Sequence, residues 1–133
     1  HSHHQFEIDQ PGKDSLELRK AGADEMLVAC RTRWALMVDT APPDDPVLQE
    51  LVDRLDQNKL DLILVEGFKH ESFPKIELHR PSRGKPLMFP EDPDIMAFAC
   101  DASPTELPDL PLLDINQPQM IAEFVVSYCG KKR

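Results

Sequence analysis

Residues 60–68 read Leu-Asp-Leu-Ile-Leu-Val-Glu-Gly-Phe, and this stretch decides the fold class. Its four consecutive apolar residues, 62–65, are typical of a parallel strand that is covered on both faces. Just upstream, apolar residues recur at helical spacing over 47–55, with Asp45 as the expected cap and Pro46 as the first helical residue. A helix that leads into a buried strand is typical of α/β folds, so we expect this helix to pack on a mostly parallel sheet.

The rest of the chain alternates between short strands and helices. We expect a helix at 14–21, capped by Asp14 with Glu17 as its capping-box partner, and a last helix that begins at Asn116. The expected strands are residues 26–30, 34–38, 75–79, 95–100 and 110–113. Residues 70–94 show no helical period, which makes them a non-helical extension within one domain that spans 1–133.

The composition narrows the classes of partner. Lys and Arg number 15 against 24 Asp and Glu, so the net charge is −9, which argues against non-specific binding of nucleic acid. The longest apolar run, 95–100, is too short to cross a membrane. The three cysteines, Cys30, Cys100 and Cys129, lack C-x-x-C spacing, and we expect them to be buried thiols. The sequence therefore predicts a cytoplasmic protein with no nucleic-acid or membrane partner.

Glu66 is the first candidate functional residue, because it follows the apolar run 62–65 at the end where α/β sheets bind their ligands. A carboxylate at this place, followed by Gly67, has the layout of a Walker B acid that holds Mg²⁺ beside a nucleotide phosphate. The alternative is a surface glutamate that begins an ordinary loop.

A second candidate site lies near the start of the chain. It gathers imidazole, carboxylate, ammonium and hydroxyl groups beside the expected start of a helix, where an anion is favoured. Its members are His1, His3, His4, Asp9, Lys13, Asp14 and Ser15. Helix capping alone is an equally good account of Asp14, and His-x-His-His lacks the second half of a structural zinc site.

The chain holds no complete phosphate-binding loop. In the Gly-Lys pair near the start of the chain, Gly12-Lys13, Asp14 follows where the Walker A motif has Ser or Thr. Residues 58–61, Asn-Lys-Leu-Asp, have the N-K-x-D spacing that many GTPases use to read guanine. They precede the expected strand 62–65, however, and so lie at the wrong end of it.

Three segments together resemble a known family. They are residues 1–4 (His-Ser-His-His), residues 11–23 with Pro-Gly-Lys-Asp-Ser and Ala-Gly-Ala, and residues 60–69 with Val-Glu-Gly-Phe-Lys. In order and spacing they are similar to the molybdopterin-guanine dinucleotide biosynthesis adaptor family, MobB. Residues 112–116, Leu-Leu-Asp-Ile-Asn, also fit ahead of the final helix.

The resemblance implies a P-loop NTPase-like fold, GTP binding with Mg²⁺, and a homodimer formed through an extended sheet. It implies an accessory role to the guanylyltransferase that attaches GMP to molybdopterin, with molybdopterin as an intermediate that the protein could bind. Glu66 and Gly67 match the Walker B end, as the metal ligand and a nucleotide-binding residue. His1, His3, His4, Lys13, Asp14 and Ser15 match the segment beside the phosphates.

Family members carry a strand and a Walker A loop ahead of the position of His1, and we expect the chain without them to bind GTP weakly. No catalytic residue is assigned, and any hydrolysis of GTP is expected to be weak. Two other functions stay open: a P-loop GTPase or small-molecule kinase, and a dimeric scaffold that delivers cofactor intermediates without nucleotide.

Overall fold

The computed structural model of the 133-residue chain describes residues 8–40, 45–102 and 109–130. The chain divides into two compact units, His1–Lys69 and His70–Arg133. No helix within the described residues is both long enough and apolar enough to cross a membrane.

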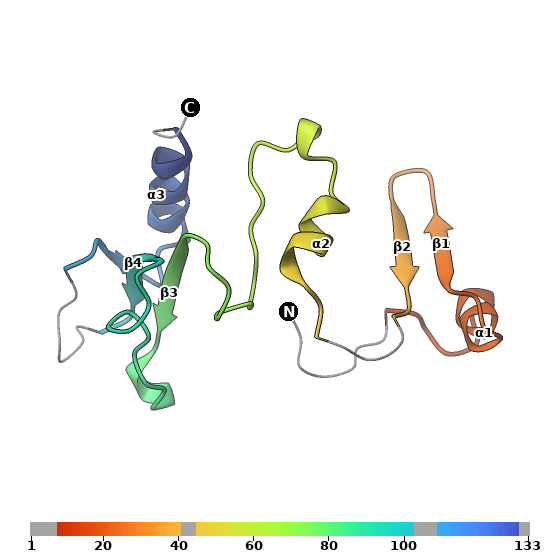
Figure 1. Ribbon diagram of the computed structural model, residues 1–133, viewed down its shortest axis with the longest axis horizontal. Coiled ribbons are helices and arrows are strands. Elements are labelled where there is room, and N and C mark those ends of the chain that lie inside the picture. The colour runs from red at the N-terminus through yellow and green to blue at the C-terminus, as the bar shows by residue number, and fades with distance from the viewer. Residues whose placement is uncertain (1–7, 41–44, 103–108, 131–133) are drawn as a thin grey trace. The chain divides into compact units, whose positions relative to one another are not determined.

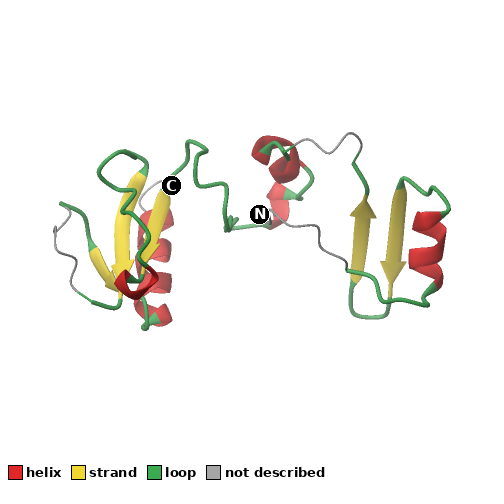
Figure 2. Ribbon diagram, turned by 90° about the horizontal axis from the view of Figure 1, so that it is seen from below, coloured by secondary structure: helices red, strands yellow, loops and turns green. Residues whose placement is uncertain are grey.

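The first unit contains a helix beside a two-stranded antiparallel hairpin, followed by two short helices (Figures 1 and 2). The elements are α1 (Asp14–Lys20), β1 (Glu25–Ala29), β2 (Trp34–Val38), α2 (Leu48–Asp53) and the 3-10 helix η1 (Gln57–Lys59). In the hairpin, Met26 pairs with Met37 and Ala29 pairs with Trp34. Cys30 N–H donates to the Arg33 carbonyl at 2.8 Å, which closes the tight connection expected between these strands.

Both helices of this unit begin differently from the expectation. Asp14 was expected to cap α1, but Lys13 holds the cap position and no side chain caps the helix. Likewise α2 begins at Leu48 with Val47 at the cap position, two residues later than Pro46. The apolar stripe at 47–55 is therefore longer than α2, which ends at Asp53. No residue of α2 is buried.

The expected strand at 62–65 is wrong as an assignment of secondary structure. Residues 60–66 form no strand, and the side chain of Leu64 is 77% exposed. The physical reason is the supply of partners, since a parallel strand needs neighbouring strands for its N–H and C=O groups. Among the described residues of this unit, the only strands are β1 and β2, and neither pairs with residues 60–66.

The cysteines are also less buried than predicted. Cys30 is exposed at the end of β1, while Cys100 and Cys129 are partly buried. Hydrogen bonds from the backbone and then the hydroxyl of Thr32, and from the backbone of Arg33, lower the pKa of the Cys30 thiol. The apolar residues of β1 and β2 suggested a buried hairpin, and Cys30 was expected to be buried with it. In the structure only Met37 of the two strands is buried, so Cys30 is exposed.

The second unit is a three-stranded parallel sheet with a helix packed against it (Figure 2). Its elements are β3 (Lys75–His79), the 3-10 helix η2 (Pro81–Arg83), β4 (Ile95–Cys100), β5 (Leu112–Asp114) and α3 (Pro118–Gly130). The strand order is β3-β4-β5, with β4 in the centre. The predictions of strands at 75–79 and 95–100 and of an α/β fold are confirmed, and the last strand and helix each begin two residues later than predicted.

The core of the second unit is built on β4. Ala97 and Ala99 cluster with Leu113 of β5, and Ile121 and Phe124 of α3 pack against this cluster. Phe98, which lies between Ala97 and Ala99 in the sequence, is also fully buried. Successive side chains of β4 are therefore buried on both faces of the sheet, as its unbroken apolar run predicts.

The other face of the sheet is covered by aromatic residues and by the connection from β3 to β4. The rings of His79 and Phe89 lie 5.8 and 5.5 Å from the ring of Phe98. Glu77 is buried, and its carboxylate accepts the backbone N–H groups of Met88 and Phe89 at 2.9 and 2.8 Å. Parallel strands are usually joined by an α-helix. Here no α-helix joins β3 to β4, and the buried carboxylate of Glu77 binds the backbone of the connection.

Polar residues lie at the carboxyl ends of the three parallel strands and contact one another there. Arg80, just after β3, pairs with Asp101 after β4 at 2.5 Å and donates to Asn116 at 3.2 Å. Asp114 ends β5 and accepts the backbone N–H of Asn116 and the side-chain amide of Gln117. These hydrogen bonds, the first of them most strongly, lower the pKa of Asp114.

We expect Phe98→Ala to destabilise the second unit strongly, because it removes the large, fully buried side chain in the middle of the β4 core. Truncations of this kind cost about 3–5 kcal/mol in the free energy of unfolding. Val126→Ala on the exposed side of α3 is the control and should change stability by about 0.5 kcal/mol or less. Urea unfolding followed by circular dichroism measures both, and equal stabilities would contradict this account of the core.

We expect the second unit to lose stability in acid through two aspartates. An ion pair with Lys75 lowers the pKa of Asp92, and hydrogen bonds lower that of Asp114. A carboxyl whose pKa is lower in the folded state stabilises the fold above its unfolded pKa of about 3.9, and this contribution is lost as the pH falls through the folded value.

Asp92→Asn and Asp114→Asn should therefore each be less stable than the wild type at pH 7, and the difference should shrink below about pH 3.9. The measurement is urea unfolding across the pH range. Glu91→Gln, at an exposed neighbouring position, is the control. A difference that does not depend on pH would show that the ionised carboxylates are not responsible.

Candidate functional site

The segment that leads into α1 is a tight turn followed directly by the helix. Lys13 N–H donates to the Gln10 carbonyl at 3.2 Å, and Gly12 has φ of 85°. Proline followed by glycine with positive φ is the pattern of a type II turn. Since Lys13 also holds the cap position and its carbonyl accepts the N–H groups of Leu16 and Glu17, turn and helix form one continuous unit.

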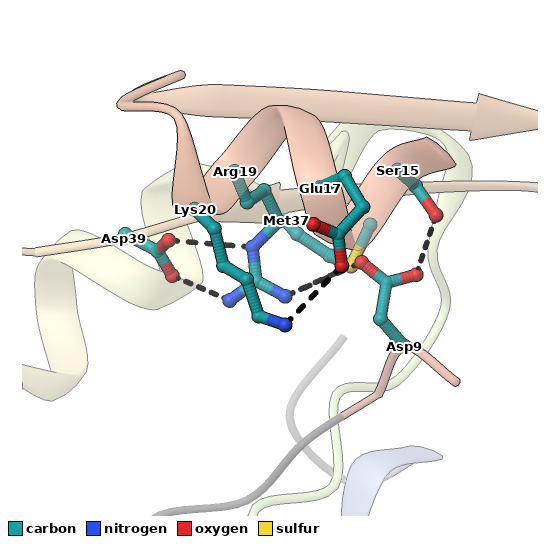
Figure 3. A network of polar contacts seen from close by, with 7 residues as sticks. All are labelled: Asp9, Ser15, Glu17, Arg19, Lys20, Met37 and Asp39. Carbon is teal, nitrogen blue, oxygen red and sulfur yellow. Dashed lines mark hydrogen bonds and ion pairs between the residues drawn. The ribbon is translucent and has the colours of Figure 1, made fainter. Parts of the chain in front are cut away.

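A network of polar contacts holds this segment (Figure 3). Ser15 Oγ donates to Asp9 Oδ1 at 2.8 Å, and Arg19 Nη1 lies 3.4 Å from Asp9 Oδ2. Arg19 also donates to Asp39 through Nη2 at 2.9 Å and Nε at 3.3 Å, and its Nη1 lies 4.0 Å from the sulfur of Met37. The network joins the chain before α1, the helix itself and the end of β2.

The side chains of Lys13 and Asp14 lie outside this network and are exposed. Because Asp14 is the first residue of α1 and does not cap it, the capping account of Asp14 is wrong. An exposed ammonium and an exposed carboxylate therefore precede Ser15 at the start of the helix. The ammonium of Lys13 can donate hydrogen bonds to phosphate oxygens, whereas the hydroxyl proton of Ser15 is donated to Asp9.

Glu66 and Gly67 lie in the non-strand segment after η1. Gly67 has φ of 84° and the next residue, Phe68, has φ of 50°. A positive φ is uncommon for a bulky residue, and such backbone conformations are enriched at ligand sites. The side chain of Glu66 is exposed. The structure thus gives the backbone after Glu66 an unusual conformation at Phe68 that the sequence did not predict.

The residues present are compatible with Mg²⁺ bound to a nucleotide. Magnesium is usually held by one or two carboxylates together with waters and substrate phosphates, so the single carboxylate of Glu66 is a sufficient protein ligand. A protein-only metal cage is not found, because no group of three or more His, Cys, Asp or Glu in the described ranges could hold a metal ion. His1, His3 and His4 lie outside the described residues.

Of the residues predicted from the sequence, the structure brings together Asp9 and Ser15, with Lys13 and Asp14 beside them in the same turn. Arg19 was missed. A signal for it exists, since Ser15 and Arg19 are four residues apart on one helix and therefore lie on the same face.

Comparison with known proteins gives a consistent result. The family model described as "Molybdopterin guanine dinucleotide synthesis protein B" (MobB) matches residues 1–101. The molybdopterin-guanine dinucleotide biosynthesis adapter protein of Escherichia coli K12 is 49% identical over 133 residues, which cover 99% of this chain and 75% of that protein. The protein of the same name from Haemophilus influenzae is 41% identical over 128 residues, which cover 96% of this chain and 69% of that protein.

The matched regions include all the candidate residues, since Lys13, Asp14, Ser15, Glu66 and Gly67 fall within residues 1–101. The identity is well above the level at which a fold is shared, and it extends over almost the whole chain. The chain therefore belongs to the MobB family.

Proposed function

We propose that the chain is an adapter in the biosynthesis of molybdopterin guanine dinucleotide and that it binds GTP with Mg²⁺ on a P-loop NTPase-like fold. The observation that carries this proposal is 49% identity to an adapter protein of that pathway over 99% of the chain. The proposed partners are the guanylyltransferase and its substrate molybdopterin, and the proposed place of action is the cytoplasm.

The candidate site supports the nucleotide part of this proposal by its chemistry. The Lys13 ammonium would donate to phosphate oxygens beside Ser15, whose hydroxyl holds Asp9, and Glu66 would hold Mg²⁺ directly or through water. Bound Mg²⁺ would offset the negative charge of the phosphates. Gly67 carries no Cβ at a φ of 84°, which lets the backbone after Glu66 turn sharply.

Binding of GTP is tested by isothermal titration calorimetry on a protein in which a Walker A loop of the family precedes His1. We expect binding that depends on Mg²⁺ and that Glu66→Gln weakens by about tenfold or more, since a neutral amide is a poor Mg²⁺ ligand. Glu50→Gln, exposed in the first turn of α2, is the matched control and should bind as the wild type does.

The other functions give different results in the same experiment. Absence of Mg²⁺-dependent GTP binding in the wild type would overturn the nucleotide proposal. Turnover of about 1–100 per second with an acceptor substrate would instead identify a kinase. Intact binding of the guanylyltransferase by Glu66→Gln, with GTP binding lost, would favour a scaffold whose delivery role does not need nucleotide.

We also propose that the protein is a homodimer in which the extension, residues 70–94, contributes to the interface. Within the described residues β3 pairs with β4 alone, so one edge of β3 has no neighbouring strand. On the same strand Leu78 is 63% exposed. An exposed edge beside an apolar side chain is a surface on which a second strand can pair.

Sedimentation equilibrium at micromolar concentration tests the dimer. The wild type is expected to be dimeric, and Leu78→Lys should shift it toward monomer because a charge on β3 opposes strand pairing. Val126→Lys, on the exposed side of α3, is the control and should leave the dimer intact. A wild type that sediments as a monomer would contradict this proposal.

A further inference from the structure

Arg19 is the residue on which the contacts around α1 converge. Its guanidinium contacts Asp9 ahead of the helix, Asp39 just after β2, and the sulfur of Met37 within β2 (Figure 3). One side chain therefore links three segments that are separated by up to 30 positions in the sequence.

The two ion pairs of Arg19 differ in exposure. The side chains of Arg19 and Asp9 are 14% and 9% exposed, whereas that of Asp39 is 56% exposed. Water screens the pair with Asp39, so its value lies mainly in the geometry of two N–H groups that reach both oxygens of one carboxylate. The pair with Asp9 is more shielded, and there the charge of Arg19 compensates a carboxylate that is largely removed from water.

Asp9 is held from two sides by α1. Its Oδ1 accepts the Ser15 hydroxyl, and its Oδ2 lies beside the Arg19 guanidinium. Ser15 and Arg19 are one helical turn apart, so both reach the same carboxylate. The chain from Asp9 to Ser15 is thereby closed into a short loop, with the Pro11-Gly12 turn inside it. This closure fixes where Lys13 and Ser15 stand at the start of the helix.

The charge of Arg19 is already compensated. Two carboxylates, Asp9 and Asp39, contact its guanidinium, so the group carries little unbalanced positive charge for a phosphate. Lys13, in contrast, presents an exposed ammonium two residues ahead of Ser15. The two cations of the segment are therefore suited to different tasks, Lys13 to contact an anion and Arg19 to hold the structure that presents it.

We propose that Arg19 is a positioning residue: through Asp9 and Asp39 it fixes the loop of residues 9–15, in which the Ser15 hydroxyl is bound to Asp9, and so places Lys13 and its ammonium for a nucleotide phosphate. This inference rests on the proposed function, because the phosphate is the ligand proposed there. Arg19 itself does not touch the ligand. The fork of its guanidinium matters because a lysine could reach one carboxylate but could not give the same set of parallel contacts.

The positioning role is tested first without ligand, by amide hydrogen exchange on the 133-residue chain. Arg19→Gln should speed exchange about tenfold or more at Lys13, Leu16 and Glu17, whose N–H groups close the turn and the first turn of α1. Arg19→Lys should fall between this variant and the wild type. Lys20→Gln, the matched control, removes a neighbouring exposed cation that pairs with Glu17 and should have no such effect.

The Cys30 amide in the β1–β2 hairpin is the internal reference, because its hydrogen bond to Arg33 does not involve the network. Exchange that rises at Cys30 as much as at Lys13 would indicate general unfolding and overturn a specific role in the loop. Unchanged exchange at Lys13, Leu16 and Glu17 would overturn it too. Ser15→Ala, which removes one hydroxyl and leaves the ion pairs, gives a milder second variant and should speed exchange at the same three amides.

The second arm is titration of Mg²⁺ and GTP into the protein with a Walker A loop ahead of His1. Arg19→Gln should weaken GTP about tenfold or more, with partial recovery in Arg19→Lys and none of the loss in Lys20→Gln. Wild-type affinity in Arg19→Gln would overturn the positioning of ligand-binding groups while the proposed function stands. If the wild type itself binds no GTP, the proposed function fails, and the exchange experiment alone decides whether Arg19 holds the loop.

Discussion

A buried strand must find hydrogen-bond partners on its edges, and this constraint separates the two most apolar runs of the chain. Residues 95–100 lie between β3 and β5, so their backbone groups are paired on both sides and their side chains form a core. Residues 62–65 are as apolar, yet neither of the two described strands in their unit pairs with them. The same sequence pattern therefore gives a strand in one unit and an irregular segment in the other.

This contrast explains how far the sequence predicts the fold. The strands 34–38, 75–79 and 95–100 were predicted with their observed bounds, because alternation, apolar runs and turn residues are local signals. Pairing is not local, so neither the parallel order β3-β4-β5 nor the irregular course of 62–65 was readable from apolar runs. Helix starts were misplaced by a residue or two, since an aspartate near the start of a helix was taken for its cap.

The pattern of apolar residues also did not predict which face of β3 is buried. Ile76 and Leu78 are the apolar residues of β3, but Glu77 and His79 are its buried residues and Leu78 is exposed. The carboxylate of Glu77 is buried because two backbone N–H groups, 11 and 12 residues later, donate to it. In the candidate site the residue types near α1 were readable from the sequence, whereas the central place of Arg19 depends on where β2 ends.

The anchoring of Glu77 has a consequence for how the chain tolerates change. The 15 residues between β3 and β4 are held at one end by Arg80 and Asp101 and toward the other by the two amides bound to Glu77. Between these anchors, Pro81–Lys85 is exposed and includes Gly84 with φ of 59°. Lengthening a loop whose ends are fixed costs little conformational entropy. The tip near Gly84 is therefore the place where extra residues or a fluorescent label could be accommodated while the sheet stays intact.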